Sequence, residues 1–240
     1  GEILFDGKNL HEMTGREQSQ RIGYVLQNPD NQIVTDKVWH ELAFGLESLG
    51  YKSAEIRIRV AEMASYFGIQ DWFYKNVAEL SGGQKRRVAI AGVLAMQPEV
   101  LILDEPAAGL DVVMRERFYQ LLLEDFAQTG RTFLVSTHII EEAASVFEQV
   151  IILDQGRILE NSPTEELVEQ FRYISGREDV VDQACAGLEV LSVQQMGRHK
   201  TAAVRGSDAQ FRQARQADVD VSPMNLQNVF VALCGHGDAQ

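Results

Sequence analysis

The sequence predicts an α/β protein built around a parallel β-sheet. Three short apolar runs rich in β-branched residues have the length and composition of buried strands, at residues 100–103, 132–135 and 150–153. The segments between them, 115–128 and 140–147, carry apolar residues at helical spacing. Strands that alternate with helices pair in parallel, so these segments predict one α/β sheet.

Ahead of this block, amphipathic patterns predict two helices at residues 36–50 and 53–67. With the helical pattern that follows them, they form a helical insert over about residues 36–96. Short strands are predicted near the start of the chain, at residues 2–5 and 23–27.

The pattern changes towards the C-terminus. Two strands are predicted at residues 188–193 and 201–205, separated by a polar turn, and a helix is predicted at residues 226–233. We interpret this part as a small accessory domain of α+β type. The predicted domains are therefore residues 1–171 and residues 172–240.

Composition excludes several classes of protein. The chain has 240 residues, of which 45% are hydrophobic, which is enough for a substantial core. A net charge of −13 argues against a nucleic-acid partner, because phosphate contacts need clustered Lys and Arg. No apolar stretch approaches the roughly 18 residues of a membrane span. We therefore expect a soluble protein. Cys185 and Cys234 form no CxxC pattern, so we expect a reducing, cytoplasmic setting.

Two carboxylates, Asp104 and Glu105, follow the predicted strand at residues 100–103. Side chains at the carboxyl end of such a strand project into the crevice where α/β sheets bind ligands. There Asp104 can hold a magnesium ion, and Glu105 can orient or deprotonate an attacking water. The alternative is an ordinary surface turn, for which Asp has a preference.

The run Leu80-Ser81-Gly82-Gly83-Gln84 precedes a helical pattern over residues 85–96. Its two glycines let a ligand approach the backbone, and the helix start offers unpaired N–H groups to a phosphate. The alternative is a plain helix-capping loop.

In their order and spacing, these motifs resemble those of ABC transporter ATP-binding subunits, over about residues 1–165. Leu80 to Gln84 resembles the family's signature sequence, and Asp104-Glu105 resembles the end of its Walker B strand. The resemblance implies a P-loop NTPase-like fold with ATP and Mg²⁺ as ligands. It assigns catalysis to Glu105 and His138, the metal to Asp104 and Gln27, and nucleotide binding to Gln27, Ser81, Gly82, Gly83, Gln84 and Asp111.

Three of these residues also have simpler interpretations. Gln27 can be an ordinary polar residue that precedes the Asn28-Pro29 turn. Asp111 can be the cap of a helix that begins near Val112. His138 can be a hydrogen-bonded histidine at a strand end.

The sequence departs from the family at the phosphate-binding loop. No GxxxxGK[ST] motif is present in the 240 residues. Compared with the family, the chain begins after that loop, and we interpret the ATPase domain as N-terminally truncated. We expect residues 1–240 alone to bind ATP weakly or not at all and to be inactive by themselves.

Different segments of the chain resemble different subfamilies of ABC ATPases. The segment 28–32 looks like energy-coupling-factor or cobalt importer ATPases, whereas residues 151–159 and 226–233 look like drug or antibiotic exporter ATPases. The direction of transport stays open. Expected partners are a second ABC ATPase subunit and an integral membrane transporter subunit, at the cytoplasmic face of the membrane. The alternative is a catalytically silent partner or gene fragment that supplies only a signature loop.

Overall fold

The structure, a computed structural model, describes residues 1–235 and contains two compact units, Gly1–His138 and Ile139–Gln240. We call them the N-terminal unit and the C-terminal unit. No helix among residues 1–235 is both long enough and apolar enough to cross a membrane.

The N-terminal unit is built on a three-stranded parallel sheet in the order β3-β4-β5. Leu101 and Leu103 on the central strand are fully buried, which confirms the predicted parallel strand at this position. The unit's elements are β1 (Leu4–Phe5), β2 (Lys8–Asn9), α1 (Gly15–Arg21), β3 (Ile22–Val25), α2 (Val38–Ser48), α3 (Ser53–Tyr66), α4 (Gly82–Ala95), β4 (Val100–Asp104), α5 (Val112–Thr129) and β5 (Thr132–Ser136).

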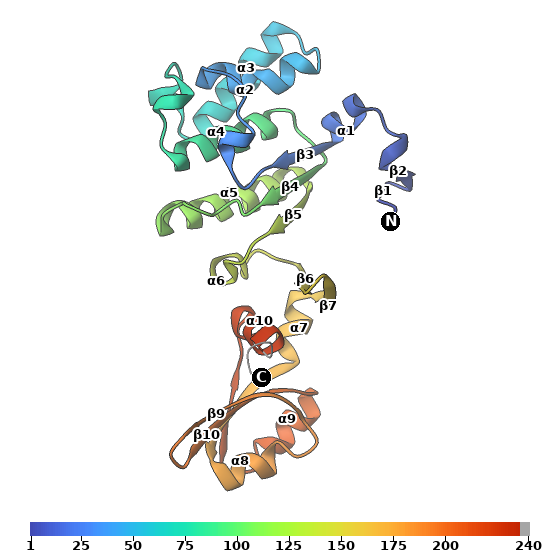
Figure 1. Cartoon of the computed structure of the whole chain (residues 1–240), viewed down its shortest axis with the longest axis vertical. Coiled ribbons are helices and arrows are strands. Elements are labelled where there is room, and N and C mark those ends of the chain that lie inside the picture. The colour runs from blue at the N-terminus through green and yellow to red at the C-terminus, as the bar shows by residue number, and fades with distance from the viewer. Residues whose placement is uncertain (236–240) are drawn as a thin grey trace. The chain divides into compact units, whose positions relative to one another are not determined.

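Helices α2, α3 and α4 pack on one another, as the predicted helical insert requires (Figure 1). Val38, Leu42 and Leu46 recur every fourth residue of α2 and are all fully buried. Gly45 lies on the same helix. A Cβ at this position would come within 2.4 Å of Met96 Sδ, so glycine lets α2 and α4 approach closely.

Strand β5 is less buried than the sequence predicts. Leu134 is 52% exposed, and Tyr24, which lies in the same row across the sheet through Ile102, is 47% exposed, so this face of the sheet is partly uncovered. The parallel pairing predicted for residues 132–135 is confirmed, but the prediction that the whole run is buried is wrong.

The C-terminal unit contains a four-stranded antiparallel sheet in the order β11-β8-β10-β9. Its succession β8-α8-β9-β10-α9-β11 is a β-α-β-β-α-β arrangement. The unit's elements are α6 (Ile140–Ala143), β6 (Gln149–Asp154), β7 (Arg157–Pro163), α7 (Thr164–Glu169), β8 (Phe171–Arg177), α8 (Glu178–Ala184), β9 (Glu189–Met196), β10 (His199–Arg205), α9 (Asp208–Ala214), β11 (Val219–Pro223) and α10 (Leu226–Cys234).

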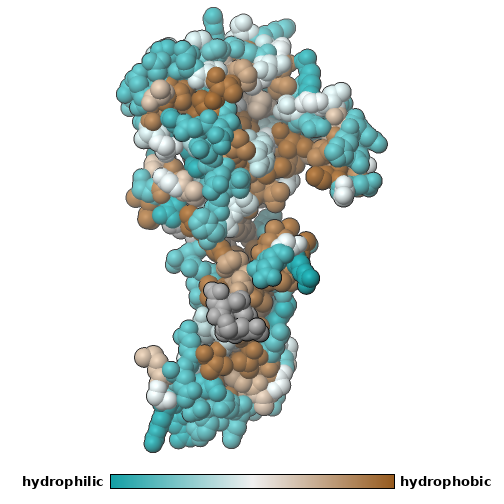
Figure 2. Space-filling model, viewed as in Figure 1, coloured by the Kyte–Doolittle hydropathy of each residue, from teal (hydrophilic) through white to brown (hydrophobic). Residues whose placement is uncertain are grey.

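The prediction that residues 150–153 form a buried strand of the parallel sheet is wrong. The strand exists as β6, but it forms an antiparallel hairpin with β7. Gln155 and Gly156 both have positive φ angles, and such a two-residue turn returns the chain at once beside itself. Ile151 and Leu153 are therefore exposed, and apolar side chains reach the surface around this hairpin (Figure 2).

The structure divides the chain earlier than the predicted boundary between residues 171 and 172. Ile152 and Leu167 belong to the same buried cluster as Met224 and Val229 of the C-terminal unit. Residues 139–171 therefore share a core with the C-terminal sheet, and the predicted helix at 140–147 is shortened to α6.

Candidate functional site

Three parallel strands bring the predicted catalytic residues together at the carboxyl end of the sheet, which we call the carboxyl edge. In the ladder, Asp104 at the end of β4 lies opposite Ser136 at the end of β5. Glu105 and His138 follow these two strands, and Gln27 follows β3, the third strand of the sheet. Carboxyl ends of parallel strands are where α/β sheets bind ligands, so this edge is the candidate active site.

Glu105 is held through both its backbone and its side chain. Its backbone has a φ of 44°, and its N–H donates to the Ser136 carbonyl at 2.9 Å. Its carboxylate accepts from Thr137 Oγ1 at 3.1 Å and from the His138 N–H at 3.0 Å. His138 Nδ1 lies 2.6 Å from Oε1 of the same carboxylate. Such left-handed backbone at a non-glycine residue is costly and is concentrated at functional sites.

Glu105 and His138 differ in their exposure to solvent. The Glu105 side chain is 16% exposed, whereas that of His138 is 73% exposed. The contact of Nδ1 with the Glu105 carboxylate orients the His138 ring, most of which is exposed to solvent. His138 is hydrogen-bonded, as the simpler interpretation proposed, but its partner is the predicted catalytic carboxylate.

Asp104 and Gln27 have the donor chemistry for magnesium. Asp104 accepts from Ser136 Oγ through one oxygen, Oδ1, at 2.5 Å. Gln27 is exposed at the same sheet edge. Among the described residues no group of three or more His, Cys, Asp or Glu side chains could hold a metal by itself. Mg²⁺ commonly uses one or two protein oxygens together with waters and substrate phosphates, so the two residues fit the ion as part of a nucleotide complex.

Ser81 to Gln84 form the start of helix α4. Ser81 and Gln84 cap each other: the Gln84 N–H donates to Ser81 Oγ at 3.3 Å, and the Ser81 N–H donates to Gln84 Oε1 at 2.9 Å. The capping interpretation is therefore confirmed for this loop. It leaves nucleotide binding open, since a Cβ added at Gly82 would meet nothing within 4 Å and space exists for a ligand.

Asp111 caps helix α5 by accepting from the Met114 N–H at 3.0 Å. The capping interpretation again holds. The neighbouring Leu110 lies next to the signature loop, because a Cβ added at Gly83 would be 3.4 Å from Leu110 Cδ2. Leu110, which directly precedes Asp111, therefore lies beside the start of α4.

Arg86 is a site residue that the sequence interpretation missed. It lies between Lys85 and Arg87 in a run of three basic residues, a pattern typical of a solvent-exposed helix face, yet it is only 7% exposed. Its guanidinium donates to the Glu105 carbonyl at 2.7 Å and to the Gln27 carbonyl at 2.5 Å. Burial lowers the pKa of Arg86, and the nearby charge of Glu105 opposes that shift. One side chain of the signature helix therefore ties together two strand ends of the candidate active site.

Gln32 and Glu41 hold the segment that follows Gln27. Gln32 Oε1 accepts from the Leu26 N–H at 2.8 Å. Glu41, which is 8% exposed, accepts from the Val34 and Thr35 N–H groups at 3.1 and 2.8 Å. No local sequence pattern indicates these contacts, and those of Glu41 depend on how α2 lies against the segment at residues 34–35.

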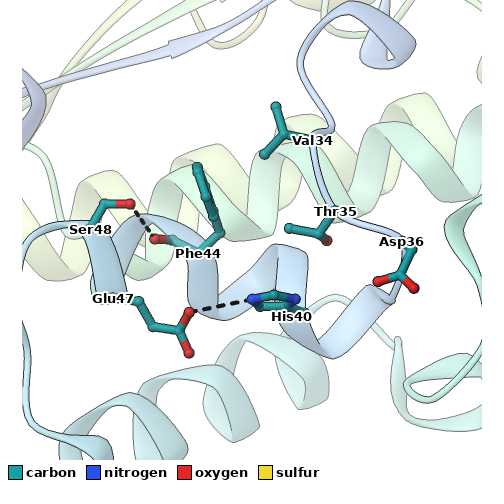
Figure 3. Close-up of a pocket in the computed structure, with 7 residues that line it drawn as sticks. All are labelled: Val34, Thr35, Asp36, His40, Phe44, Glu47 and Ser48. Atoms are coloured by element: carbon teal, nitrogen blue, oxygen red, sulfur yellow. Dashed lines mark hydrogen bonds and ion pairs between the residues drawn. The ribbon is translucent and has the colours of Figure 1, made fainter.

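A surface depression lies beside this segment, between residues 34–36 and one face of α2 (Figure 3). His40 Nε2 lies 3.4 Å from Oε2 of Glu47, and the Phe44 side chain extends from the same helix towards Val34 (Figure 3). None of the predicted catalytic residues lines it. Its lining residues are Val34, Thr35, Asp36, His40, Phe44, Glu47 and Ser48.

Solved structures with this fold define its class. The chain superimposes with a TM-score of 0.61 on cbiO1 from Clostridium perfringens, described as part of the ABC transporter complex cbiONQ. The two are 36% identical over 68% of this chain and 66% of that one. It matches the ATP-binding cassette MJ0796, solved bound to ADP and Pi, with the same TM-score and 27% identity over 68% and 73% of the chains. The fold is that of an ABC ATPase, in the P-loop NTPase class.

Sequence comparison finds similarity in the N-terminal part of the chain. Residues 1–108 match the family model described as ABC transporter. The chain is 42% identical over 167 residues to the energy-coupling factor transporter ATP-binding protein EcfA1 of Streptococcus thermophilus, covering 70% of this chain and 60% of the relative. The first curated relatives are matched over 29–60% of their own length. The predicted resemblance to ABC ATP-binding subunits is confirmed, and the exporter-like character of the C-terminal part stays a prediction.

Proposed function

We propose that this protein is the ATP-binding and ATP-hydrolysing subunit of an ABC transporter. The observation that carries the proposal is the Glu105 carboxylate, fixed by Thr137 and His138 next to Asp104 at the carboxyl edge of the sheet. Its similarity to ABC ATP-binding proteins supports the same assignment.

The arrangement suits water activation beside a bound nucleotide. MgATP would supply the phosphoryl group, with Asp104 and Gln27 holding the ion. Glu105 keeps a partly exposed carboxylate in a fixed orientation, so it can polarise an attacking water and accept its proton. His138 contacts the Glu105 carboxylate through Nδ1, which orients its ring.

The proposed partners follow from the separate position of the signature loop. Two ATPase subunits would sandwich ATP, with Ser81, Gly82, Gly83 and Gln84 of one facing nucleotide held by the other, close to Asp111. An integral membrane subunit would complete the transporter at the cytoplasmic face of the membrane. Nucleic acid is not a proposed partner.

We assign the membrane subunit to the depression of Figure 3. Val34 is 64% exposed and Phe44 is 43% exposed, so the depression offers apolar contact area. Glu41 connects the segment at residues 34–35 to α2, and Gln32 connects it back to Leu26. A movement of the membrane subunit at the depression would therefore be transmitted through Glu41 and Gln32 to Leu26, and so to Gln27, which follows Leu26 in the chain.

The 240 residues alone would lack most phosphate contacts, because they contain no GxxxxGK[ST] loop. We propose that they do not hydrolyse ATP by themselves. The alternative of a silent partner, which supplies only a signature loop, rests on the same feature. The two are separated by adding the loop and measuring turnover.

The test is a chimera that supplies a strand, a GxxxxGKS loop and a helix ahead of Gly1. We predict ATP hydrolysis by this chimera and a loss of about 10²–10⁴-fold in rate on Glu105→Gln, because the amide keeps the shape but cannot accept the proton. ATP binding should persist. Glu116→Gln on the exposed face of α5 is the control and should hydrolyse at the parental rate.

A chimera that binds ATP but does not hydrolyse it would favour the silent partner. Hydrolysis by Glu105→Gln at the parental rate would show that Glu105 is not the base.

A further inference from the structure

The two carboxylate oxygens of Glu105 differ in their contacts. Oε1 accepts from the His138 N–H at 3.0 Å and lies 2.6 Å from His138 Nδ1. These two nitrogens take up both acceptor positions of Oε1, and they exclude a further donor whichever atom carries the proton between Nδ1 and Oε1. Oε2 has one partner among the described residues, Thr137 Oγ1 at 3.1 Å. Because a carboxylate oxygen has two lone pairs, Oε2 keeps one acceptor position that no described residue fills.

The backbone of Glu105 is fixed as well, so the oxygen beside Thr137 has a set position. The Glu105 N–H donates to the Ser136 carbonyl at 2.9 Å, and the Glu105 carbonyl accepts from Arg86 at 2.7 Å. Only 16% of the Glu105 side chain is exposed. Oε2 is thus the oxygen that can accept a further hydrogen bond while every existing one is kept.

Thr137 is placed for this contact by strand β5. It directly follows Ser136, the last residue of β5, which lies opposite Asp104 in the parallel ladder. Threonine is branched at Cβ, so its χ1 angle has few allowed values and its hydroxyl few positions. A hydroxyl that donates to an ionised carboxylate makes one of the stronger kinds of hydrogen bond. Thr137 can therefore hold Oε2, and the acceptor position left on it, in one direction.

We infer that Oε2 is the oxygen of Glu105 that takes the proton of the attacking water, and that Thr137 is the positioning residue for it. The inference rests on the proposed function, in which Glu105 is the base. In this step an O–H bond of the water breaks and the proton goes to Oε2. The water oxygen bonds to the terminal phosphorus of ATP while the bridging P–O bond breaks, and the electron pair of that bond stays on ADP. The contacts of Oε1 with His138 are kept.

The contact is tested first in the 240-residue chain, where no nucleotide is needed. The carboxyl ¹³C resonance of Glu105 is identified by its loss in Glu105→Gln. It should move in Thr137→Val, which keeps the shape of threonine but has no hydroxyl. Thr137→Ser keeps the hydroxyl and should leave the resonance near its parental position. Thr132→Val, at an exposed threonine at the start of β5, is the control and should also leave it there.

The role of Oε2 is tested in the chimera that carries a GxxxxGKS loop ahead of Gly1. Thr137→Val should lower kcat by about tenfold, because the proton acceptor loses a hydrogen bond to its charged form. The dissociation constant for ATP should stay at its parental value, since Thr137 acts on Glu105 and not on the nucleotide. Thr137→Ser should recover most of kcat, which a loss of packing alone would not allow, and Thr132→Val should hydrolyse at the parental rate.

Two outcomes would overturn the inference. One is a Glu105 resonance that does not move in Thr137→Val, and the other is a parental kcat in that variant. A chimera with parental Thr137 that binds ATP but does not hydrolyse it would count against the proposed function itself. The role of Oε2 would then fail with it, although the shift of the resonance would persist.

Discussion

At the scale of single residues, Arg86 shows how the candidate site is held together. Its guanidinium joins the carbonyls of Gln27 and Glu105, which follow two neighbouring strands. A buried guanidinium is costly unless its donors are used, and removing it leaves both carbonyls without that partner. Arg86 is therefore a positioning residue for the loop that carries Glu105, the proposed catalytic carboxylate.

We predict that Arg86→Met lowers the free energy of unfolding by about 1–3 kcal/mol, because methionine fills similar space but donates no hydrogen bond. Urea denaturation of the 240-residue chain measures the change. Arg57→Met removes an exposed arginine of α3 and should stay within about 0.5 kcal/mol of the parent. Equal midpoints for the two variants would show that the Arg86 contacts contribute nothing.

The site residues that belong to short sequence motifs could be predicted from the sequence. Asp104, Glu105 and His138 follow apolar strands, and the structure joins all three at one sheet edge. Arg86 was missed because its partner Gln27 lies 59 residues away, and only the packed fold brings the two together. Glu41 was missed for a similar reason, since its carboxylate caps a segment that no local pattern marks.

At the scale of elements, the α3–α5 contact includes a phenol whose pKa is shifted. Tyr66 on α3 donates to the Leu121 carbonyl on α5 at 3.0 Å. Burial raises the pKa of Tyr66 to about 12, and the carboxylates of Glu124 and Asp125 add to the shift. Because the folded state favours the neutral phenol, its contribution is complete below the ordinary pKa of about 10.

We predict that stability is lost between pH ~10 and ~12 more steeply in the parent than in Tyr66→Phe, since the variant has no phenol to ionise. The measurement is the urea midpoint at several pH values in this range. Tyr74→Phe, at a ring that is 77% exposed, should keep the parental slope. Parallel curves for parent and Tyr66→Phe would contradict the assignment.

Elements were predicted well where local pattern decides them. α2, α3 and β4 begin and end within about two residues of the predicted limits, as is usual for boundaries. The pairing of β6 was not predictable from its apolar run, because a buried parallel strand and a half-exposed hairpin strand can share one composition. β8 was missed entirely: its sequence, FRYISGR, mixes charged and apolar residues, and only Phe171 and Ile174 are fully buried.

At the scale of the whole molecule, the proposed nucleotide contacts all lie in one unit. The N-terminal unit holds the candidate active site and the signature loop, and the C-terminal unit contains none of the predicted site residues.

The signature loop gives the test of the proposed contact with nucleotide on a partner subunit. Gly82 is the first residue of α4, and a Cβ there would meet nothing within 4 Å, so an aspartate fits without steric cost. A carboxylate in the first turn of a helix is favoured by the helix dipole. Gly82→Asp should therefore keep or slightly raise the stability of the isolated chain. Opposite a nucleotide, the same carboxylate would face phosphate and repel it.

We predict that this chain associates in an ATP-dependent way with an ABC ATPase that has a P-loop but cannot hydrolyse ATP, and that Gly82→Asp abolishes the association. Sedimentation of the mixture with and without ATP measures it. Ala54→Asp puts the same charge into the first turn of α3 and should associate as the parent does, because that helix start is not proposed to face nucleotide. The effect should appear as association, since one helix N-terminus contributes only about 0.3–2 kcal/mol to anion binding. Equal ATP-dependent association of parent and Gly82→Asp would exclude contact between this loop and the nucleotide.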